Sequence, residues 1–352
     1  MITASEPRLS VIVVTHNSRS AVQRCLPPLV DQLARDDELV VVDNASIDGT
    51  LAAVREAAPR VRAVASAENL GFAAGANAGA DAASGELLLF LNPDAEPAPG
   101  FVEAIRRPGR DERGWSAWMG LVTMDGGRCV NTSGGIIHFT GIAWSGAAGS
   151  PVASAPTAPR EVAFLSGTCL AIPRDTWARH GGFDPAFFMY CEDVELSLRL
   201  RLAGGRLGLE PDARVDHSYD FAKGPAKWRR LEANRWATMI HAYPGPLLAV
   251  VSPALLATEL ALLPLAAAGG WLGPKLAATR QTATSLPRLL RERRAIQAGR
   301  QVSPAEFARW LTADLDSVYL GRAATLAPLR RALRVYWRLA RWALGAGRSR
   351  GA

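Results

Sequence analysis

The sequence predicts an α/β fold with a mostly parallel central sheet, followed by a C-terminal α-helical extension. Over the first hundred residues, short apolar β-branched runs alternate with helical patterns, which is typical of a parallel sheet with helices on both faces. Past residue 243 the composition becomes strongly apolar and then rich in arginine. We therefore expect two parts, residues 1–243 and 244–352, and 352 residues are enough to bury a full core.

Four apolar runs predict buried strands, and most are followed by a polar or glycine-containing loop and a helical pattern. These predicted strands are residues 9–14, 39–42, 61–65 and 87–91. Helices are predicted at 71–83, which is rich in Gly and Ala, and at 192–202. Because open α/β sheets place ligands at the carboxyl ends of their strands, the polar residues after these runs are candidate site residues.

Segment 145–159 is so rich in Ala, Ser, Gly and Pro that it predicts a mobile loop. Such a loop either orders over a bound donor or is a tolerated surface insertion.

Two acidic sites stand about a hundred residues apart. Asp94 closes the run at 87–91 within Asn92-Pro93-Asp94, so its carboxylate is expected at the carboxyl end of a strand. Glu192 and Asp193 begin the predicted helix at 192–202. Two separated carboxylate sites suggest metal-assisted group transfer, in which Asp94 holds a nucleotide's metal. Hard oxygen ligands suit Mg²⁺ or Mn²⁺.

Small polar residues and glycines follow the second and third runs. Asp43 is placed to accept hydrogen bonds from a base or ribose, and Asn44 can cap the following helix. Gly71 lies between Asn69 and Asn77 at a helix start, where bare backbone can approach a diphosphate. Close packing of a glycine-rich helix would give the same string.

The positive charge of the chain lies in its C-terminal part. Residues 1–279 hold 25 Lys and Arg against 29 Asp and Glu, whereas residues 280–352 hold 15 against 4. Trp, Tyr and Leu alternate with the arginines there, which favours an anionic membrane surface over nucleic acid as the partner.

Two segments of the extension fit a membrane. Residues 246–272 are apolar with Glu259 as their one charge, but Pro253, Pro264 and a Gly-Gly pair argue against a simple span. We expect a shallow hairpin in one leaflet, or else a helical pair packed on the first part. Residues 328–345 predict an amphipathic helix that either lies in a membrane interface or packs on the protein through its leucines. Its arginines are Arg330, Arg331, Arg334, Arg338 and Arg341, and its apolar face is Leu329, Leu333, Tyr336, Trp337, Ala340 and Leu344.

The cysteines and the first residues indicate the compartment. Cys25, Cys129, Cys169 and Cys191 are widely spaced and form no CxxC pair, so we expect free thiols in a reducing cytosol. Residues 1–8 lack the pattern of an export signal.

Taken together, these strings resemble the inverting family 2 glycosyltransferases of the GT-A fold, and in detail a bacterial subgroup similar to rhamnosyltransferases. The resemblance runs from about residue 9 to residue 244. Six strings in the family's order carry it: residues 13–17, 42–50, 69–77, 91–94, 166–168 and 183–193.

The resemblance implies roles for individual residues. The implied nucleotide pocket is lined by Thr15, Asn17, Asp43 and Gly71, and we extend this site to Asn44, Asn69 and Asn77. Asp94 would hold a divalent ion on the diphosphate, and His217 is either a further metal ligand or a loop histidine. Asp193 would be the catalytic base, because a sugar hydroxyl is a poor nucleophile until a carboxylate takes its proton. Glu192 and Glu195 would bind other acceptor hydroxyls, although Glu195 could instead pair with Arg199 one turn on.

Two departures from the family pattern matter, and a third string bears on whether transfer is processive. Asn92-Pro93-Asp94 stands where many relatives carry Asp-x-Asp, so only one carboxylate is available for the metal. His16 stands where many relatives have a Tyr, which leaves the identity of the nucleotide open. Residues 232–236, Glu-Ala-Asn-Arg-Trp, only approximate the Gln-x-x-Arg-Trp of processive synthases, which favours transfer of a single sugar.

The expected function is an inverting glycosyltransferase at the cytoplasmic face of the membrane. It would move one sugar, rhamnose from dTDP-rhamnose being the first choice, to a lipid-linked or cell-wall glycan. The alternative is a noncatalytic membrane-associated sugar-nucleotide-binding protein of the same fold. A nucleotidyltransferase would need a glycine-rich basic loop early in the chain, and residues 15–19 do not form one.

Overall fold

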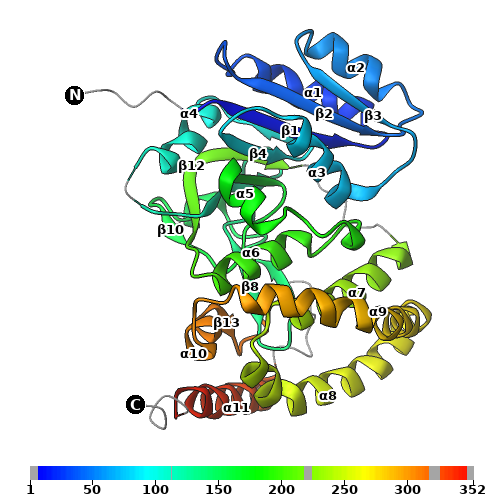
Figure 1. Ribbon diagram of the computed structural model, residues 1–352, viewed down its shortest axis with the longest axis vertical. Helices are drawn as coiled ribbons and strands as arrows, with labels where there is room; N and C mark the ends of the chain where they lie inside the picture. Colours follow the sequence, from blue (N-terminus) through cyan, green and yellow to red (C-terminus); the bar gives the residue numbers. More distant parts are fainter. Residues whose placement is uncertain (1–6, 112, 218–223, 317–325, 347–352) are drawn as a thin grey trace.

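The computed structural model describes residues 7–111, 113–217, 224–316 and 326–346. A twisted sheet with helices on both faces forms the upper part in Figure 1, and a layer of helices from the C-terminal part lies below it. The strand order in the large sheet is β10-β12-β6-β11-β4-β1-β2-β3, with β5 paired to β12 and β7 paired to β6. The predicted α/β class is therefore confirmed.

The first half of the sheet is parallel, as predicted. Its strands are β1 (Leu9–Thr15), β2 (Glu38–Asn44), β3 (Arg62–Ser66) and β4 (Leu87–Leu91). Every residue of β1 and β4 is buried, which explains why these strands read as continuous apolar runs. The helices that alternate with them are α1 (Arg19–Val30), α2 (Thr50–Ala57) and α3 (Gly71–Ala82).

Beyond β4 the sheet is mixed, which corrects the predicted mostly parallel sheet. Strand β11 begins at the carboxyl end of β4, with Cys169 opposite Leu91, and therefore runs antiparallel to it. The elements of this half are β5 (Ala95–Pro97), α4 (Phe101–Arg106), β6 (Ala117–Met124), β7 (Cys129–Thr132), β10 (Arg160–Glu161), β11 (Cys169–Pro173), α5 (Arg174–His180), α6 (Glu192–Leu202) and β12 (Leu207–His217).

Segment 145–159, predicted to be a mobile loop, is hydrogen-bonded to its neighbours. Val130 N–H donates to Ser150 O at 2.8 Å, Gly149 N–H donates to Val130 O at 2.9 Å, and Val152 N–H donates to Arg128 O at 2.9 Å. These bonds tie residues 149–152 to β7 and to Arg128 just before it, while the predicted mobility of the segment stays a prediction.

The C-terminal part is built from helices that pack on the part of the chain that holds the large sheet. They are α7 (Gly224–Ala242), α8 (Gly245–Ala268), α9 (Leu272–Ala298), α10 (Pro304–Phe307) and α11 (Ala327–Ala346). A second hydrophobic core joins both sides of the predicted boundary at residue 243, for example Leu198 and Phe139 with Leu247 and Trp337. Strand β13 (Leu311–Thr312) also pairs in parallel with β8 (Gly135–His138), and β9 (Ala143–Ser145) completes this small sheet.

Helix α8 is the one described helix that is long and apolar enough to cross a membrane by length and composition alone. Helix α11 packs on the second core through part of the apolar face predicted for membrane contact. Trp337, Ala340 and Leu344 are buried there, and Phe139 stacks on Trp337 with ring centroids 4.9 Å apart. The packed alternative is therefore correct for these residues.

Helix α3 lies close on β1 and β2 because it carries glycine at the contact. A Cβ atom at Gly79 would come within 2.4 Å of Ile12 Cγ2, and one at Gly75 within 2.7 Å of Val14 Cγ1. Gly75, which belongs to the predicted diphosphate string at 69–77, thus also serves helix packing, as the alternative expected.

We expect Gly79→Ala to lower the free energy of unfolding by about 1 to 3 kcal/mol, since the added methyl overpacks the interface. Gly273→Ala is the matched control: no atom lies within 4 Å of its added Cβ, so it should be neutral or stabilise by up to about 1 kcal/mol. Urea unfolding checks both variants, and equal stability of the two would contradict this account of the α3 contact.

Candidate active site

The ends of β1 and β2 bring two residues of the predicted nucleotide pocket side by side. In the parallel register, Thr15 lies opposite Asp43. The Thr15 hydroxyl donates to Asp43 Oδ1 at 2.9 Å, and the Ser46 hydroxyl donates to the same oxygen at 2.5 Å. Asp43 is buried, so these donors hold its carboxylate in one orientation at the carboxyl edge of the sheet.

Asn44, Asn69 and Gly71 form a second connected group beside this pair. Asn44 Nδ2 donates to Gly71 O, and Gly71 N–H donates to Asn69 Oδ1, both at 2.9 Å. Asn44 does not cap α2, which corrects that predicted role: the residue before α2 is Gly49. The Oδ1 atom of Asn44 is buried and finds no hydrogen-bond partner among the described residues. A ligand donor at this position would remove the cost of that buried acceptor.

Two further asparagines of the predicted pocket are bonded within the protein. Asn17 stays in the loop beside Asp43, where its N–H donates to the Ser46 hydroxyl at 2.8 Å and its Oδ1 accepts from Ile47 N–H at 2.9 Å. Asn77 instead exchanges two hydrogen bonds with the backbone of Phe183, at 2.8 and 3.0 Å. Asn77 lies on α3 and bonds the loop before α6, and its predicted contact with the nucleotide stays a prediction.

The predicted metal ligands Asp94 and His217 lie together. Strand β5 pairs antiparallel with β12 so that Ala95 is opposite His217, and this register puts the imidazole next to Asp94. His217 Nε2 lies 3.1 Å from Asp94 Oδ1 and 3.4 Å from Asn92 Nδ2. A carboxylate and an imidazole thus meet at the end of β4.

Asp193 stands in the first turn of α6 and is held by backbone N–H groups. Gly167 N–H donates to its Oδ2 at 2.9 Å, and Val194 N–H donates to its Oδ1 at 2.8 Å. Burial raises the pKa of Asp193, while these hydrogen bonds oppose the rise. The carboxylate is therefore both oriented and more basic than a solvated aspartate, which are the two properties that a general base needs.

Residues 166–168 connect this carboxylate to the end of β4. Asn92 N–H donates to Thr168 O at 3.0 Å, and the neighbouring Gly167 bonds Asp193. The string at 166–168, one of the six that carried the resemblance, therefore links Asp193 to Asn92, two residues before Asp94.

Glu192 is a buried carboxyl beside Asp193. Its Oε2 atom finds no hydrogen-bond partner among the described residues. Burial, together with the charge of Asp193, raises the pKa of Glu192 to about 8. A neutral carboxyl at this position can donate a hydrogen bond to an acceptor hydroxyl, which agrees with its predicted role.

Glu195, also predicted to bind the acceptor, faces the interior. Its two carboxylate oxygens lie 2.9 and 2.8 Å from Arg199 Nε, and its Oε1 lies 3.0 Å from His241 Nδ1. The pairing with Arg199, given as the alternative, is confirmed. With 1% of Glu195 exposed, this geometry does not support its contact with an acceptor.

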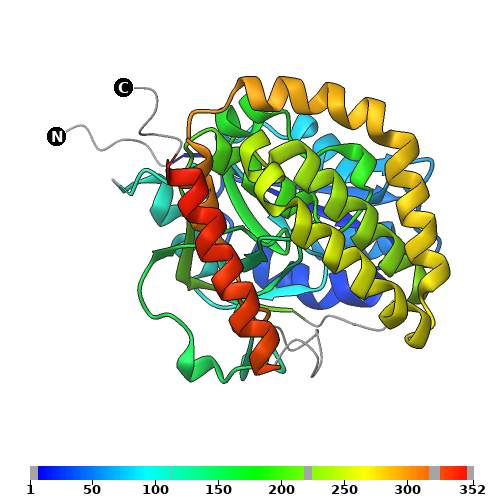
Figure 2. The ribbon, with the colours of Figure 1, turned by 90° about the horizontal axis from the view of Figure 1, so that it is seen from below.

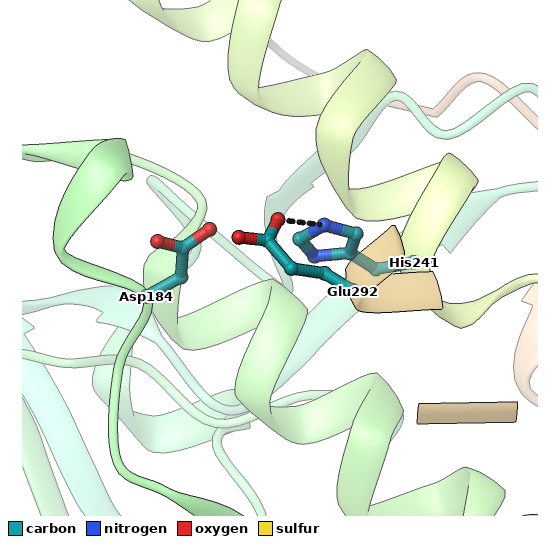
Figure 3. Close-up of side chains that lie close together, drawn as sticks. All are labelled: Asp184, His241 and Glu292. Atoms are coloured by element: carbon teal, nitrogen blue, oxygen red, sulfur yellow. Dashed lines mark hydrogen bonds and ion pairs between the residues drawn. The ribbon is translucent and has the colours of Figure 1, made fainter. Parts of the chain in front are cut away.

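The structure brings together a second cluster that could hold a cation, which the sequence did not predict. Asp184, His241 and Glu292 each offer a ligand atom, and these atoms lie within 4.8 Å of one another (Figure 3). Arg288 Nη1 lies 3.2 Å from Asp184 Oδ2 and 2.8 Å from Glu292 Oε2, so a guanidinium already supplies positive charge there. The three residues come from a loop, from α7 and from α9, and no local pattern in the sequence links them.

The fold and the site together define a sugar-nucleotide-dependent transferase, and the comparisons agree. Residues 10–113 match the family "Glycosyl transferase family 2", and residues 138–278 match "Glycosyl transferase family group 2". The chain is a family 2 glycosyltransferase, similar to rhamnosyltransferases, and it uses a nucleotide sugar.

One similar protein is the N-acetylglucosaminyl-diphospho-decaprenol L-rhamnosyltransferase of Mycobacterium tuberculosis. It is 28% identical over 264 residues, which are 66% of this chain and 83% of the relative. The rhamnosyltransferase WbbL of Escherichia coli is 41% identical over 56 residues, covering 16% of this chain and 21% of that protein.

Solved structures support the GT-A-like fold. GalNAc-T7 with UDP, GalNAc and Mn²⁺ has a TM-score of 0.57 and 18% identity over 70% of this chain, which spans half of the GalNAc-T7 chain. Residues 1–349 of Staphylococcus aureus TarS give 0.50 and 16% identity, covering 97% of this chain and 91% of that one. The mannosyltransferase PcManGT of Pyrobaculum calidifontis, with GDP-Man and Mn²⁺, gives 0.50 and 21% identity, covering 84% and 86%.

Glu192→Gln tests whether the buried carboxyl of Glu192 keeps its proton in the folded protein. Because the folded protein keeps the Glu192 proton up to about pH 8 and the unfolded chain releases it near pH 4.5, wild-type stability should fall with rising pH across this window. Glutamine has no proton to lose. We expect the stability of the variant relative to wild type to rise by at least about 1 kcal/mol between pH 5 and pH 8.5.

Urea unfolding at the two pH values measures this difference, with Glu68→Gln at an exposed position as the control. A difference between wild type and Glu192→Gln that does not change with pH would refute the assignment.

Proposed function

We propose that this glycosyltransferase is inverting and transfers a single sugar to a lipid-linked or cell-wall glycan, with Asp193 as its base. The observation that carries this proposal is the backbone-held Asp193 carboxylate, joined through residues 166–168 to the edge of the sheet that carries Asp94. Rhamnose from dTDP-rhamnose is the proposed donor, and the similar mycobacterial protein, named as an L-rhamnosyltransferase, supports this choice.

The chemistry assigned to Asp193 is removal of a proton. An acceptor hydroxyl near Asp193 gives up its proton as its oxygen attacks the anomeric carbon, and the nucleoside diphosphate leaves from the opposite face. The pKa of Asp193, raised by burial, makes the carboxylate a stronger proton acceptor. Glu192 would donate a hydrogen bond to a second acceptor hydroxyl from beside the base.

Asp94 and His217 fit a divalent ion at the donor diphosphate. A carboxylate oxygen and an imidazole nitrogen 3.1 Å apart suit Mn²⁺, and the oxygen ligand suits Mg²⁺ as well. When bound, such an ion neutralises charge on the leaving diphosphate. Mn²⁺ in the structures of GalNAc-T7 and PcManGT supports a metal here. The proposed nucleotide contacts are Thr15, Asn17, Asp43, Asn44, Asn69 and Gly71.

We place the enzyme at the cytoplasmic face of a membrane, where α8 and α11 would contact lipid. Both helices lie on the same side of the molecule, away from β2 and α2 (Figures 1 and 2). The one charged residue of α8, Glu259, pairs with Arg235 of α7 and Lys275 of α9, so it faces the protein. This leaves an outer surface of exposed apolar side chains at Leu256, Leu260, Leu263, Leu265, Leu339 and Trp342.

Charge and geometry favour contact in the plane of the membrane. Arg331, Arg338 and Arg341 of α11 are exposed near Leu339 and Trp342, so an anionic lipid surface would match both charge and apolarity. Crossing the membrane would separate Glu259 from its buried partners, which costs several kcal/mol. Contact with lipid would bring the enzyme to a lipid-linked acceptor at high effective concentration. The four cysteines are free thiols, which suits the cytoplasmic side.

The donor is tested with a panel of nucleotide sugars, Mg²⁺ or Mn²⁺, and membrane lipid extract as acceptor. We expect turnover of one donor, dTDP-rhamnose, and a loss of about 10²-fold or more in kcat for Asp193→Asn, because the base is gone. Asp94→Asn should raise the metal concentration needed for half-maximal rate. Tight donor binding without turnover in wild type, at any metal concentration, would favour the noncatalytic sugar-nucleotide-binding protein instead.

Membrane contact is tested by flotation with vesicles of phosphatidylcholine, with and without phosphatidylglycerol. The double variant Leu339→Glu, Trp342→Glu should bind anionic vesicles at least about tenfold more weakly, and added salt should weaken wild-type binding. Ile47→Glu, an exposed apolar site in the distant loop between β2 and α2, is the matched control. Equal binding of all three proteins would refute this docking surface. Point variants are used because removing residues 246–352 would open the second core.

A further inference from the structure

The loop that leads into α6 is strained. Phe188, Tyr190 and Cys191 have φ values of 62°, 73° and 64°, in the left-handed region that side-chain-bearing residues seldom adopt. Such a backbone conformation is unfavourable for a residue with a side chain and persists only where its surroundings enforce it. Cys191 immediately precedes α6, so the conformation of this loop sets the direction in which Glu192 and Asp193 emerge.

Asn234 of α7 holds this loop from one side. Its side-chain Nδ2 lies 3.0 Å from Phe187 O, 3.1 Å from Met189 O and 2.8 Å from Tyr190 O. The Asn234 side chain is buried, so water cannot serve its N–H groups as an alternative acceptor. The side-chain amide of Asn234 is therefore the hydrogen-bond donor to three main-chain carbonyl groups of this loop, which forms no α-helix or strand.

Helix α3 holds the same loop from the other side. Ala73 N–H donates to Phe188 O at 3.1 Å. Gly71 lies so close that a Cβ atom there would come within 2.4 Å of that oxygen. Because Gly71 is bonded to Asn44 and Asn69, the loop before the base contacts the proposed nucleotide site directly.

Helix α7 is anchored to its neighbours at the residue next to Asn234. Its neighbour Arg235 is buried, donates to Thr140 O at 2.8 Å and pairs with Glu232 and Glu259. Asn234 therefore approaches the loop from a helix that is anchored to α8 and to the small sheet.

We propose that Asn234 is a positioning residue, whose carboxamide keeps loop 187–191 in the conformation that sets Asp193 against Gly167. Asn234 does not touch Asp193 in this geometry, so it acts through the loop. The inference rests on the proposed role of Asp193 as the base. It explains why Asn follows the Glu-Ala pair in the string at 232–236, which the sequence alone did not interpret.

The test is Asn234→Ala in the full chain, with Gln297→Ala as the matched control. Gln297 Nε2 also donates to a main-chain carbonyl of α7, His241 O at 2.9 Å, but it does not touch the loop. We expect kcat to fall on the order of 10- to 100-fold in Asn234→Ala, while KM for the sugar nucleotide that wild type turns over changes less than about threefold. The control should keep both constants.

Hydrogen exchange gives a second readout that needs no substrate. Amides 188–193 should exchange faster in Asn234→Ala than in Gln297→Ala at matched thermal stability. If Asn234→Ala does not fold, Asn234→Ser retains one donor and should show an intermediate kcat and intermediate exchange. Wild-type kcat and wild-type exchange in a folded Asn234 variant would overturn the proposal.

Asp193→Asn is assayed in parallel to separate the two hypotheses. If Asp193→Asn retains activity, the assignment of the base is wrong. If Asp193→Asn is inactive and the Asn234 variant is normal, the base stands and the positioning role fails.

Discussion

Helix α6 is held between two hydrophobic cores, and the position of Asp193 depends on both. Leu196 and Leu200 pack into the core of the large sheet, whereas Val194 and Leu198 pack into the core shared with the C-terminal helices. A helix that is apolar on two sides can neither rotate nor slide without opening one of these contacts. The carboxylate in its first turn is therefore fixed by burial along the whole helix, and backbone N–H groups complete its orientation.

The features that could be predicted from the sequence are those that depend on short-range pattern. Both faces of β1 and β4 are buried, so their sequences are continuous apolar runs, and such runs predict strands. Asp43 and Asp94 were found because they close such runs. The family resemblance offered His217 only as either a metal ligand or a loop histidine, and its contact with Asp94 over a separation of 123 residues follows from the β5–β12 register, which leaves no local signal.

The features that the sequence left open depend mainly on partners that are distant in the sequence. Glu195 was placed on the acceptor side because its helix position allowed this, but His241 of α7 and Arg199 enclose it. Glu259 is the one charge in the apolar segment 246–272, and no local pattern identifies its partner Lys275, which lies across the turn into α9. The amphipathic pattern of α11 predicts an apolar face. The pattern alone does not show whether lipid or Phe139 covers Trp337 on that face.

The second core has a consequence for how this enzyme is made. Its residues extend from Ile137 to Leu344, so more than half of the chain must be synthesised between the first and the last of them. The sheet can form early from local βαβ units, but α6 is covered on its second side only after α7 has left the ribosome, and the second core is complete only after α11. Nascent chains therefore pass through a stage with an assembled sugar-nucleotide half and an uncovered catalytic helix. During that interval the apolar residues of the second core are uncovered, and α6 is not yet held between two cores.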